Sequence, residues 1–139
     1  MFARLTSVLM PLALLASMTA NATPVELQRR NDSITSVCTQ IVLIGGSTLQ
    51  GTCRPAPGQG EAISTINLNL CVGERNGDLV AGGGGFVSPG NCDVSGLFLG
   101  PIDQFILNAN CTSVSGFKIG SQLHLDQAIV SNGGSLACA

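Results

Sequence analysis

Few residues of this chain have side chains that could do catalytic chemistry. His124 is the only histidine among 139 residues, and the chain contains no tyrosine or tryptophan. A hydrolase with a Ser-His-Asp triad could use only His124, and no G-x-S-x-G motif presents a nucleophilic serine. The acidic residues are scattered and identify no pair of carboxylates of the kind that glycosidases need. We therefore expect no catalytic site, and we interpret His124 as a structural residue.

Cysteines are the second set of reactive side chains. All six lie after residue 30: Cys38, Cys53, Cys71, Cys92, Cys111 and Cys138. Their even number in a small chain with a predicted leader favours three disulfides. Zinc binding is the weaker alternative, because no C-x-x-C spacing occurs and the chain has a single histidine. No phosphate-binding motif is present either, since residues 82–85 are a plain glycine run. We expect no metal and no other cofactor.

Residues 1–22 have the pattern of a secretory signal peptide. A short basic region is followed by an apolar run over residues 8–16, and a small-x-small cleavage site ends at Ala22. The apolar run is too short to span a bilayer. Residues 23–30 are a candidate pro-segment that ends in a dibasic pair at Arg30; the alternative is two solvated charges in a flexible leader. We predict a secreted, extracellular protein.

Removal of both leader segments would leave residues 31–139, which is the length of a single domain. These 109 residues contain three Lys or Arg and seven Asp or Glu, so their net charge is −4. The absence of a basic patch argues against nucleic acid as a partner. No second apolar run is long enough to span a membrane. We therefore expect one small acidic domain.

Short strands, rather than long helices, are predicted for this domain. All 18 glycines lie in it, and glycine is unfavourable inside helices. Apolar or alternating runs recur between Gly, Asn, Ser and Pro clusters, at residues 41–44, 48–53, 63–70, 78–80, 97–99, 105–107 and 117–119. Asn76-Gly77 and Gly133-Gly134 have the composition of hairpin turns. The pattern indicates an all-β domain, whose core we expect to include Phe86, Phe98, Phe105 and Phe117.

An internal repeat is the most informative feature of the chain. Residues 66–79 align with residues 123–136 without a gap, and apolar residues match at the first, third, seventh and fourteenth positions. A pair of cysteines precedes each copy at similar spacing: Cys38 and Cys53, then Cys92 and Cys111. Two repeats, over about 36–90 and 91–138, are too few for a solenoid. We therefore predict two halves of one domain.

The repeated motifs resemble the signature of the cyanovirin-N homology family. One copy of the signature spans residues 64–69 and 76–79, and the other spans residues 122–126 and 134–136. The resemblance covers essentially all of residues 36–138. It implies a pseudo-symmetric, all-β tandem repeat in which each repeat supplies a triple-stranded sheet and a β-hairpin, with the hairpins exchanged between the halves. Secreted fungal members are common in this family, which agrees with the dibasic leader.

The resemblance also suggests how the cysteines pair. Cys38–Cys53 and Cys92–Cys111 would be the family's bridges within each repeat, whereas Cys71 and Cys138 are extra in this chain. If the hairpins cross over, the end of the chain returns to the first half, where Cys71 lies. A Cys71–Cys138 bridge would then be geometrically reasonable. The alternative is two free thiols.

Carbohydrate binding, typified by high-mannose glycans, is implied by the same resemblance. Carrying the family's two pockets over by position gives two candidate sites. The first site contains Gly73, Glu74, Arg75, Asn76, residues 84–90, Thr112, Ser113 and Ser115. The second site contains Asp32, Ser33, Arg54 with the loop 55–57, Ser131, Asn132 and Gly133. We favour the first site because it is richer in polar side chains.

Polar contacts alone can recognise a mannose-type sugar. Glu74 would accept hydrogen bonds from vicinal hydroxyls, and Arg75 and Asn76 would donate. The alternative is that Glu74 and Arg75 are solvated charges of a hairpin, and that Asn132 belongs only to a turn. Val114 departs from the family pattern, because cyanovirin-N itself has an arginine there.

Oligosaccharides, free or on glycoproteins, are thus the expected partners. The alternative is a secreted protein-interaction or cell-wall module on the same scaffold without sugar binding, since fold does not fix function. Hairpin exchange is compatible with a monomer or a domain-swapped dimer. Two N-x-S/T sequons occur in residues 31–139, at Asn31 and Asn110; both are candidate N-glycosylation sites, and a glycan on Asn110 would lie near the first site.

Overall fold

The computed structural model describes residues 31–56 and 58–139. The signal peptide, the candidate pro-segment and its dibasic pair lie outside the described residues, as does Pro57 of the loop in the second site. One helical turn, α1 (Ile34–Val37), and three 3₁₀ turns, η1 (Leu68–Leu70), η2 (Val94–Gly96) and η3 (Leu125–Gln127), accompany the strands. The strands are β1 (Asn31–Ser33), β2 (Cys38–Ile44), β3 (Thr48–Cys53), β4 (Ala62–Asn67), β5 (Val72–Arg75), β6 (Asp78–Ala81), β7 (Phe98–Leu99), β8 (Ile106–Thr112), β9 (Lys118–His124), β10 (Ile129–Asn132) and β11 (Ser135–Cys138).

The strands form small antiparallel sheets, which confirms the predicted all-β class. The first sheet has the order β2-β3-β4, and the second sheet has the order β7-β8-β9. Each is followed in the chain by a hairpin, β5–β6 after the first sheet and β10–β11 after the second. Strand β1 adds to β10 as a third strand. The molecule is therefore built from two copies of a triple-stranded sheet plus a hairpin.

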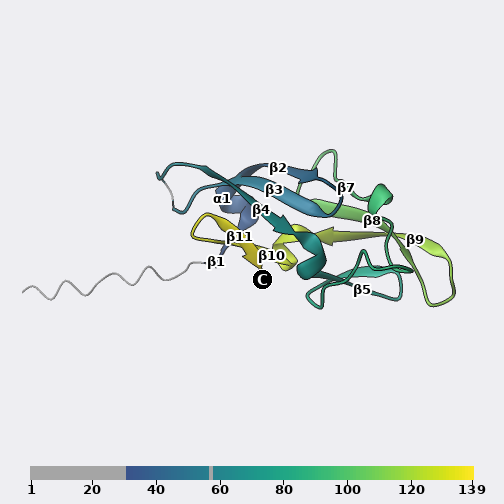
Figure 1. Ribbon diagram of the computed structural model, residues 1–139. Coiled ribbons are helices and arrows are strands. Elements are labelled where there is room, and N and C mark those ends of the chain that lie inside the picture. The colour runs from purple at the N-terminus through teal and green to yellow at the C-terminus, as the bar shows by residue number, and fades with distance from the viewer. Residues whose placement is uncertain (1–30, 57) are drawn as a thin grey trace, which may run out of the picture.

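The hairpins are exchanged between the two halves, as the resemblance implied. The backbone N–H of Leu79 in β6 donates to Oγ of Ser121 in β9, at 2.8 Å. The N–H of Leu136 in β11 donates in the same way to Oγ of Ser64 in β4, at 2.9 Å. Leu79 and Leu136, like Ser64 and Ser121, are 57 positions apart, which is the offset of the sequence repeat. Figure 1 shows the β5–β6 hairpin at the end of the molecule where β9 lies, and β6 contacts β9 there, whereas β11 contacts β4.

The repeat also builds the hydrophobic core. The matched pairs Leu68/Leu125 and Val72/Ile129 are fully buried in a single cluster of apolar side chains. Each leucine opens a 3₁₀ turn that ends its sheet, so the predicted strand 63–70 stops at Asn67. It stops there because the side chain of Asn67 accepts a hydrogen bond from the N–H of Asn69 and caps the turn.

Two of the four phenylalanines expected in the core lie elsewhere. Phe86 is fully buried and Phe105 packs partly against the core, but Phe98 is 54% exposed and Phe117 is 73% exposed. Phe98 lies in the two-residue strand β7 at a sheet edge, and Phe117 lies in the turn before β9. An apolar residue type alone therefore did not indicate burial at these positions.

Three disulfides join the six cysteines. Cys38–Cys53 links facing positions of β2 and β3, and Cys92–Cys111 links the segment before η2 to β8. Cys71–Cys138 links the end of η1 to the end of β11 across 67 positions of sequence. The first two pairings are those that the resemblance implied, and the third is the one that hairpin exchange made geometrically reasonable. The third bond ties the C-terminal hairpin to the first half of the chain.

Candidate functional site

The first candidate site is centred on the turn between β5 and β6. Asn76 and Gly77 both have positive φ, at 53° and 87°, which is the conformation that an Asn-Gly hairpin turn favours. The carboxylate of Glu74 accepts a hydrogen bond from the N–H of Gly77 and closes the turn. Oδ1 of Asn76 accepts a hydrogen bond from the N–H of Val114, at 3.0 Å, in the turn between β8 and β9. Two of the predicted segments are therefore held together by a side chain of the site itself.

The third predicted segment, residues 84–90, is joined to this pair through Asn91. The carbonyl oxygen of Asn91 accepts hydrogen bonds from both N–H and Oγ1 of Thr112, each at 3.1 Å. Its side-chain Nδ2 donates to the carbonyl of Gly85, at 3.1 Å. Sequence analysis missed Asn91. The signal was present, because the Cys92–Cys111 bridge forces the neighbours of its two cysteines together.

Side-chain exposure divides the first site into an inner and an outer part. Arg75, Asn76 and Ser115 are exposed, whereas Glu74, Thr112 and Ser113 are half-buried. The exposed Val114 lies between the two serines. Glu74 and Thr112 each contribute to internal hydrogen bonds, so they stiffen the site as well as line it. The polar residues of the site that are open to solvent are therefore Arg75, Asn76 and Ser115.

The second candidate site has the same backbone but different chemistry. The turn between β10 and β11 has Gly133 and Gly134 at positive φ, and Gly134 lies so close to Pro55 that a Cβ would be 3.2 Å from its nitrogen. Ser131 is only 1% exposed, so its hydroxyl is not open to a ligand. Arg54 and Asn132 are half-buried side chains that flank this turn. Asp32 and Ser33 lie opposite β10 in the register of β1.

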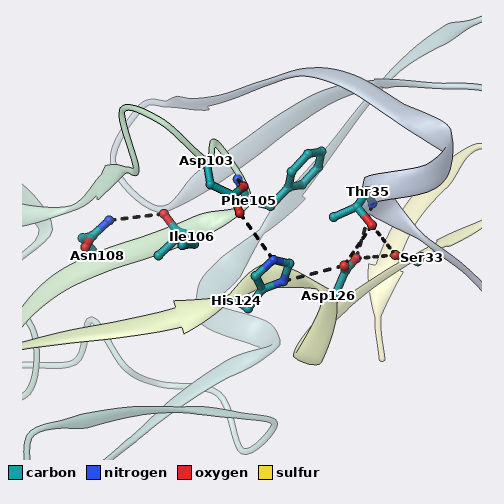
Figure 2. Close-up of polar contacts among 8 residues, drawn as sticks. All are labelled: Ser33, Thr35, Asp103, Phe105, Ile106, Asn108, His124 and Asp126. Atoms are coloured by element: carbon teal, nitrogen blue, oxygen red, sulfur yellow. Dashed lines mark hydrogen bonds and ion pairs between the residues drawn. The ribbon is translucent and has the colours of Figure 1, made fainter.

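His124 lies in neither site but in a polar cluster between the halves of the molecule (Figure 2). Its ring nitrogens lie 3.7 Å from Asp103 Oδ2 and 3.7 Å from Asp126 Oδ2. Asp126 also accepts hydrogen bonds from the hydroxyls of Ser33 and Thr35, at 2.7 Å and 3.0 Å. Ser33 thus donates to the carboxylate and not to the histidine, so the three residues do not have the order of nucleophile, base and orienting acid. The cluster links β1 and α1 to η3.

Across residues 31–56 and 58–139, no group of three or more His, Cys, Asp or Glu side chains is arranged to hold a metal ion. Within the same part of the chain, no helix has the length and apolarity needed to cross a membrane.

Comparison with known proteins agrees with this architecture. The model of the CVNH domain matches residues 35–137. The chain belongs to the CVNH family. No curated protein matches it significantly.

Solved CVNH structures share the fold. The CVNH protein of T. borchii is 28% identical, with a TM-score of 0.60, 77% of this chain and 99% of that chain being covered. The CVNH protein of Gibberella zeae is 23% identical, with a TM-score of 0.63 and coverages of 76% and 96%. Microvirin, solved as a complex with mannobiose, is 22% identical, with a TM-score of 0.57 and coverages of 78% and 99%. This chain therefore has the CVNH fold.

Proposed function

We propose that this protein is a secreted lectin that binds mannose-type oligosaccharides at the first candidate site, and that it is not an enzyme. The observation that carries the proposal is the hydrogen bond from Val114 N–H to Asn76 Oδ1. It fixes the turn of one hairpin against the turn of the second sheet and leaves the amide nitrogen of Asn76 to donate. The family assignment and the mannobiose complex of microvirin support the sugar class.

Recognition at this site would depend on hydrogen bonds fitted to hydroxyl groups. Glu74 uses one carboxylate oxygen on Gly77, so its second oxygen would accept from a pair of vicinal hydroxyls. Arg75 would donate from its planar guanidinium, and Ser113 and Ser115 would donate or accept. Because the segments are already bonded to one another, little conformational entropy would be lost on binding. Arg54 and Asn132 would supply a weaker second site.

Secretion is supported by the disulfides, independently of the predicted leader. All six cysteines are paired, and disulfides form and persist in oxidising compartments. The disulfides would also stabilise the domain by limiting the conformations of its unfolded chain. Whether the secreted protein is a monomer or a domain-swapped dimer is measured by light scattering on the purified protein.

The function is tested with a glycan array and two matched double variants. The wild-type protein is compared with Glu74→Ala/Arg75→Ala and with Arg54→Ala/Asn132→Ala. We expect mannose-type hits that the first variant abolishes and the second weakens. If the hits survive in Glu74→Ala/Arg75→Ala but are lost in Arg54→Ala/Asn132→Ala, the sugar binds at the second turn instead. A blank array with correctly folded wild-type protein would contradict the lectin proposal for the glycans tested.

A second candidate function, a protein-interaction or cell-wall module, has one observation in its favour. Val114 and Phe117, at the turn between β8 and β9, are 87% and 73% exposed, beside the first candidate site. Exposed apolar side chains that gather at one place are typical of interaction surfaces. A Val114→Ser/Phe117→Ser variant would lose binding to such a partner, but it would keep its glycan-array profile if the sugar site is polar.

A further inference from the structure

An open hollow of about 500 Å³ lies on the second sheet and belongs to neither candidate site. It is lined by Asp78, Phe98, Asn108, Ala109, Asn110, Gly120, Ser121 and Gln122. The volume is within the range of about 300 to 1,000 Å³ that is usual for ligand pockets. Side chains alternate along a strand, so Asn108 and Asn110 of β8 point to the same face, as do Gly120 and Gln122 of β9. The hollow is therefore the outer face of this sheet.

The lining combines an aromatic ring with amides, which suits a sugar ring. Phe98 is 54% exposed and pairs in register with Asn108. Nε2 of Gln122 donates to Oδ1 of Asn108, at 2.7 Å, and so fixes both amides across the strands. A pyranose has an apolar face that packs on a phenyl ring and hydroxyl or acetamido groups that meet amides. More than half of Phe98 is open to solvent, and the residue lines the hollow.

Asn110, in the same hollow, is the acceptor residue of the sequon Asn110-Cys111-Thr112. Its exposed side chain has a glycine on either side. A Cβ built on Gly96 would be 3.3 Å from Asn110 Nδ2, and one built on Gly120 would be 3.8 Å from Asn110 Oδ1. The amide group of Asn110 thus has no neighbouring side chain at the two positions that flank it.

Neither of these glycines is required by the backbone. Neither Gly96 nor Gly120 has positive φ. Among the other glycines without positive φ, Gly73 and Gly100 have a steric reason, because a Cβ would be 2.6 Å from Gly82 O and 2.5 Å from Asp103 O, whereas Gly60 has open space around it. For Gly120 the nearest group is Asn110 itself, at ordinary contact distance. Glycine inside a strand costs stability, so space beside Asn110 is the feature that these positions share.

We propose that Asn110 carries an N-linked oligosaccharide whose first N-acetylglucosamine lies in this hollow against Phe98. Asn110 and Phe98 are diagonal neighbours on adjacent strands, a separation of about 7 to 8 Å that one sugar residue bridges. The acetamido group would meet the exposed amide of Gln122, whereas Asn108 is buried and bonded to Ile106 and Gln122. The proposal rests on secretion, which the proposed function includes, and not on sugar binding at the first site.

The modification is a group transfer from a lipid-pyrophosphate-linked oligosaccharide. The amide nitrogen of Asn110 forms a bond to C1 of the first sugar, the bond from C1 to the pyrophosphate oxygen breaks, and the amide proton is released as the lipid pyrophosphate leaves. In the folded protein Cys111 is buried and bonded to Cys92, and Oγ1 of Thr112 donates to Asn91. Transfer therefore precedes the folding of β8, and the fold then accommodates the product.

Attachment is tested by intact mass. The full chain is expressed in a yeast behind the host's own secretion leader, so that translocation does not depend on residues 1–22, and recovered from the medium. We expect one N-glycan that endoglycosidase H trims to a single sugar, that is lost in Asn110→Gln, and that remains in Asn21→Gln and in Asn31→Gln, the controls at the other two sequons of the full chain. Secreted protein with an unmodified Asn110 would overturn the proposal.

Seating in the hollow is tested on the trimmed protein. We expect nuclear Overhauser contacts between the N-acetyl methyl group and the Phe98 ring, and a midpoint of thermal unfolding about 4 °C above that of Asn110→Gln. Phe98→Ser in the glycosylated protein should remove most of this difference. A sugar on Asn110 without ring contacts or a thermal effect would overturn the seating. A glycan array of Asn110→Gln, in which the hollow is empty, tests the lectin proposal separately.

Discussion

The two hairpin turns share a backbone conformation and an anchoring hydrogen bond, but their side chains differ in chemistry. Gly77 and Gly134 both have positive φ, and both lie so close to the opposite sheet that a Cβ would meet Ile119 or Pro55. In each hairpin, the leucine two residues after this glycine donates its backbone N–H to a serine hydroxyl of the opposite sheet. Apart from this matched glycine, residues 73–78 of the first turn differ at all positions from residues 130–135 of the second turn.

This difference separates the scaffold from the surface. Glu74 and Asn76 of the first turn correspond in the repeat to Ser131, which is buried, and to Gly133, which has no side chain. The first turn is therefore joined to its neighbour by a polar side chain, and the second by van der Waals contact with a proline. Duplication preserved the groups that hold the hairpins in place, whereas the groups that could bind a ligand diverged.

The largest expected effect comes from removing the disulfide that ties only one of the two hairpins to the other half of the molecule. Only β10–β11 is tied to the other half by a disulfide, Cys71–Cys138, across 67 positions. The double variant Cys71→Ala/Cys138→Ala should lose about 4 kcal/mol of unfolding free energy in the chain-entropy model. Denaturant unfolding measures the loss. A change below about 1 kcal/mol would show that the exchanged hairpin is held without the bond.

A somewhat smaller effect tests whether the two halves contribute equally to the core. Leu68 and Leu125 are both fully buried at matched positions of the repeat. Leu68→Ala and Leu125→Ala should each cost about 3 kcal/mol, because each leaves a cavity in the same cluster. Denaturation curves of the two variants should nearly coincide. If one variant is neutral, the pseudo-symmetry does not extend to the energetics.

The serine anchors should give an effect of about 2 kcal/mol each. Ser64→Ala and Ser121→Ala would leave the N–H groups of Leu136 and Leu79 without their acceptors. The two losses should again be similar, since the bonds are equivalent in the repeat. Hydrogen exchange of the two leucine amides gives a local readout. Unchanged protection of either amide would exclude that serine as its anchor.

The smallest effect concerns the turn that carries the candidate site. Asn76→Gly removes the acceptor of Val114 N–H and should cost about 1 kcal/mol, together with most of the glycan binding. Gly133→Asn is the matched control, because it creates an Asn-Gly turn at the second, less favoured site. It should leave stability within about 0.5 kcal/mol of wild type. Thermal unfolding and array binding are measured on both variants, and equal binding losses would remove the distinction between the turns.

Much of the fold could be predicted because the sequence repeats in register. The offset of 57 aligned the leucines, serines and turn glycines that the structure uses in equivalent ways. The end of β4 was not predictable from alternation, because Leu68 continues the apolar pattern while the side chain of Asn67 begins a 3₁₀ turn. The exposure of Phe98 depends on an edge strand of two residues, and no periodicity signals that position.

The candidate site was only partly predictable. Positions 73–76, 84–90 and 112–115 came from family resemblance, and the structure brings them together through Asn76 and Asn91. Asn76 was predicted as a donor, but the sequence did not indicate that the oxygen of the same amide accepts a hydrogen bond from Val114 N–H. It also included Ser131, whose burial depends on packing against the other half of the molecule. Side-chain partners of this kind depend on contacts between distant segments, which spacing does not reveal.

The most direct test of the account is a titration of ¹⁵N-labelled protein with mannobiose, followed by amide chemical shifts. The central claim is that the sugar binds at the turn of β5–β6 and the facing turn of β8–β9. We predict saturable shifts at Arg75, Gly77 and Val114, with little change at Arg54 and Gly134. Shifts centred on Arg54 and Gly134, or no shifts at millimolar mannobiose, would contradict it.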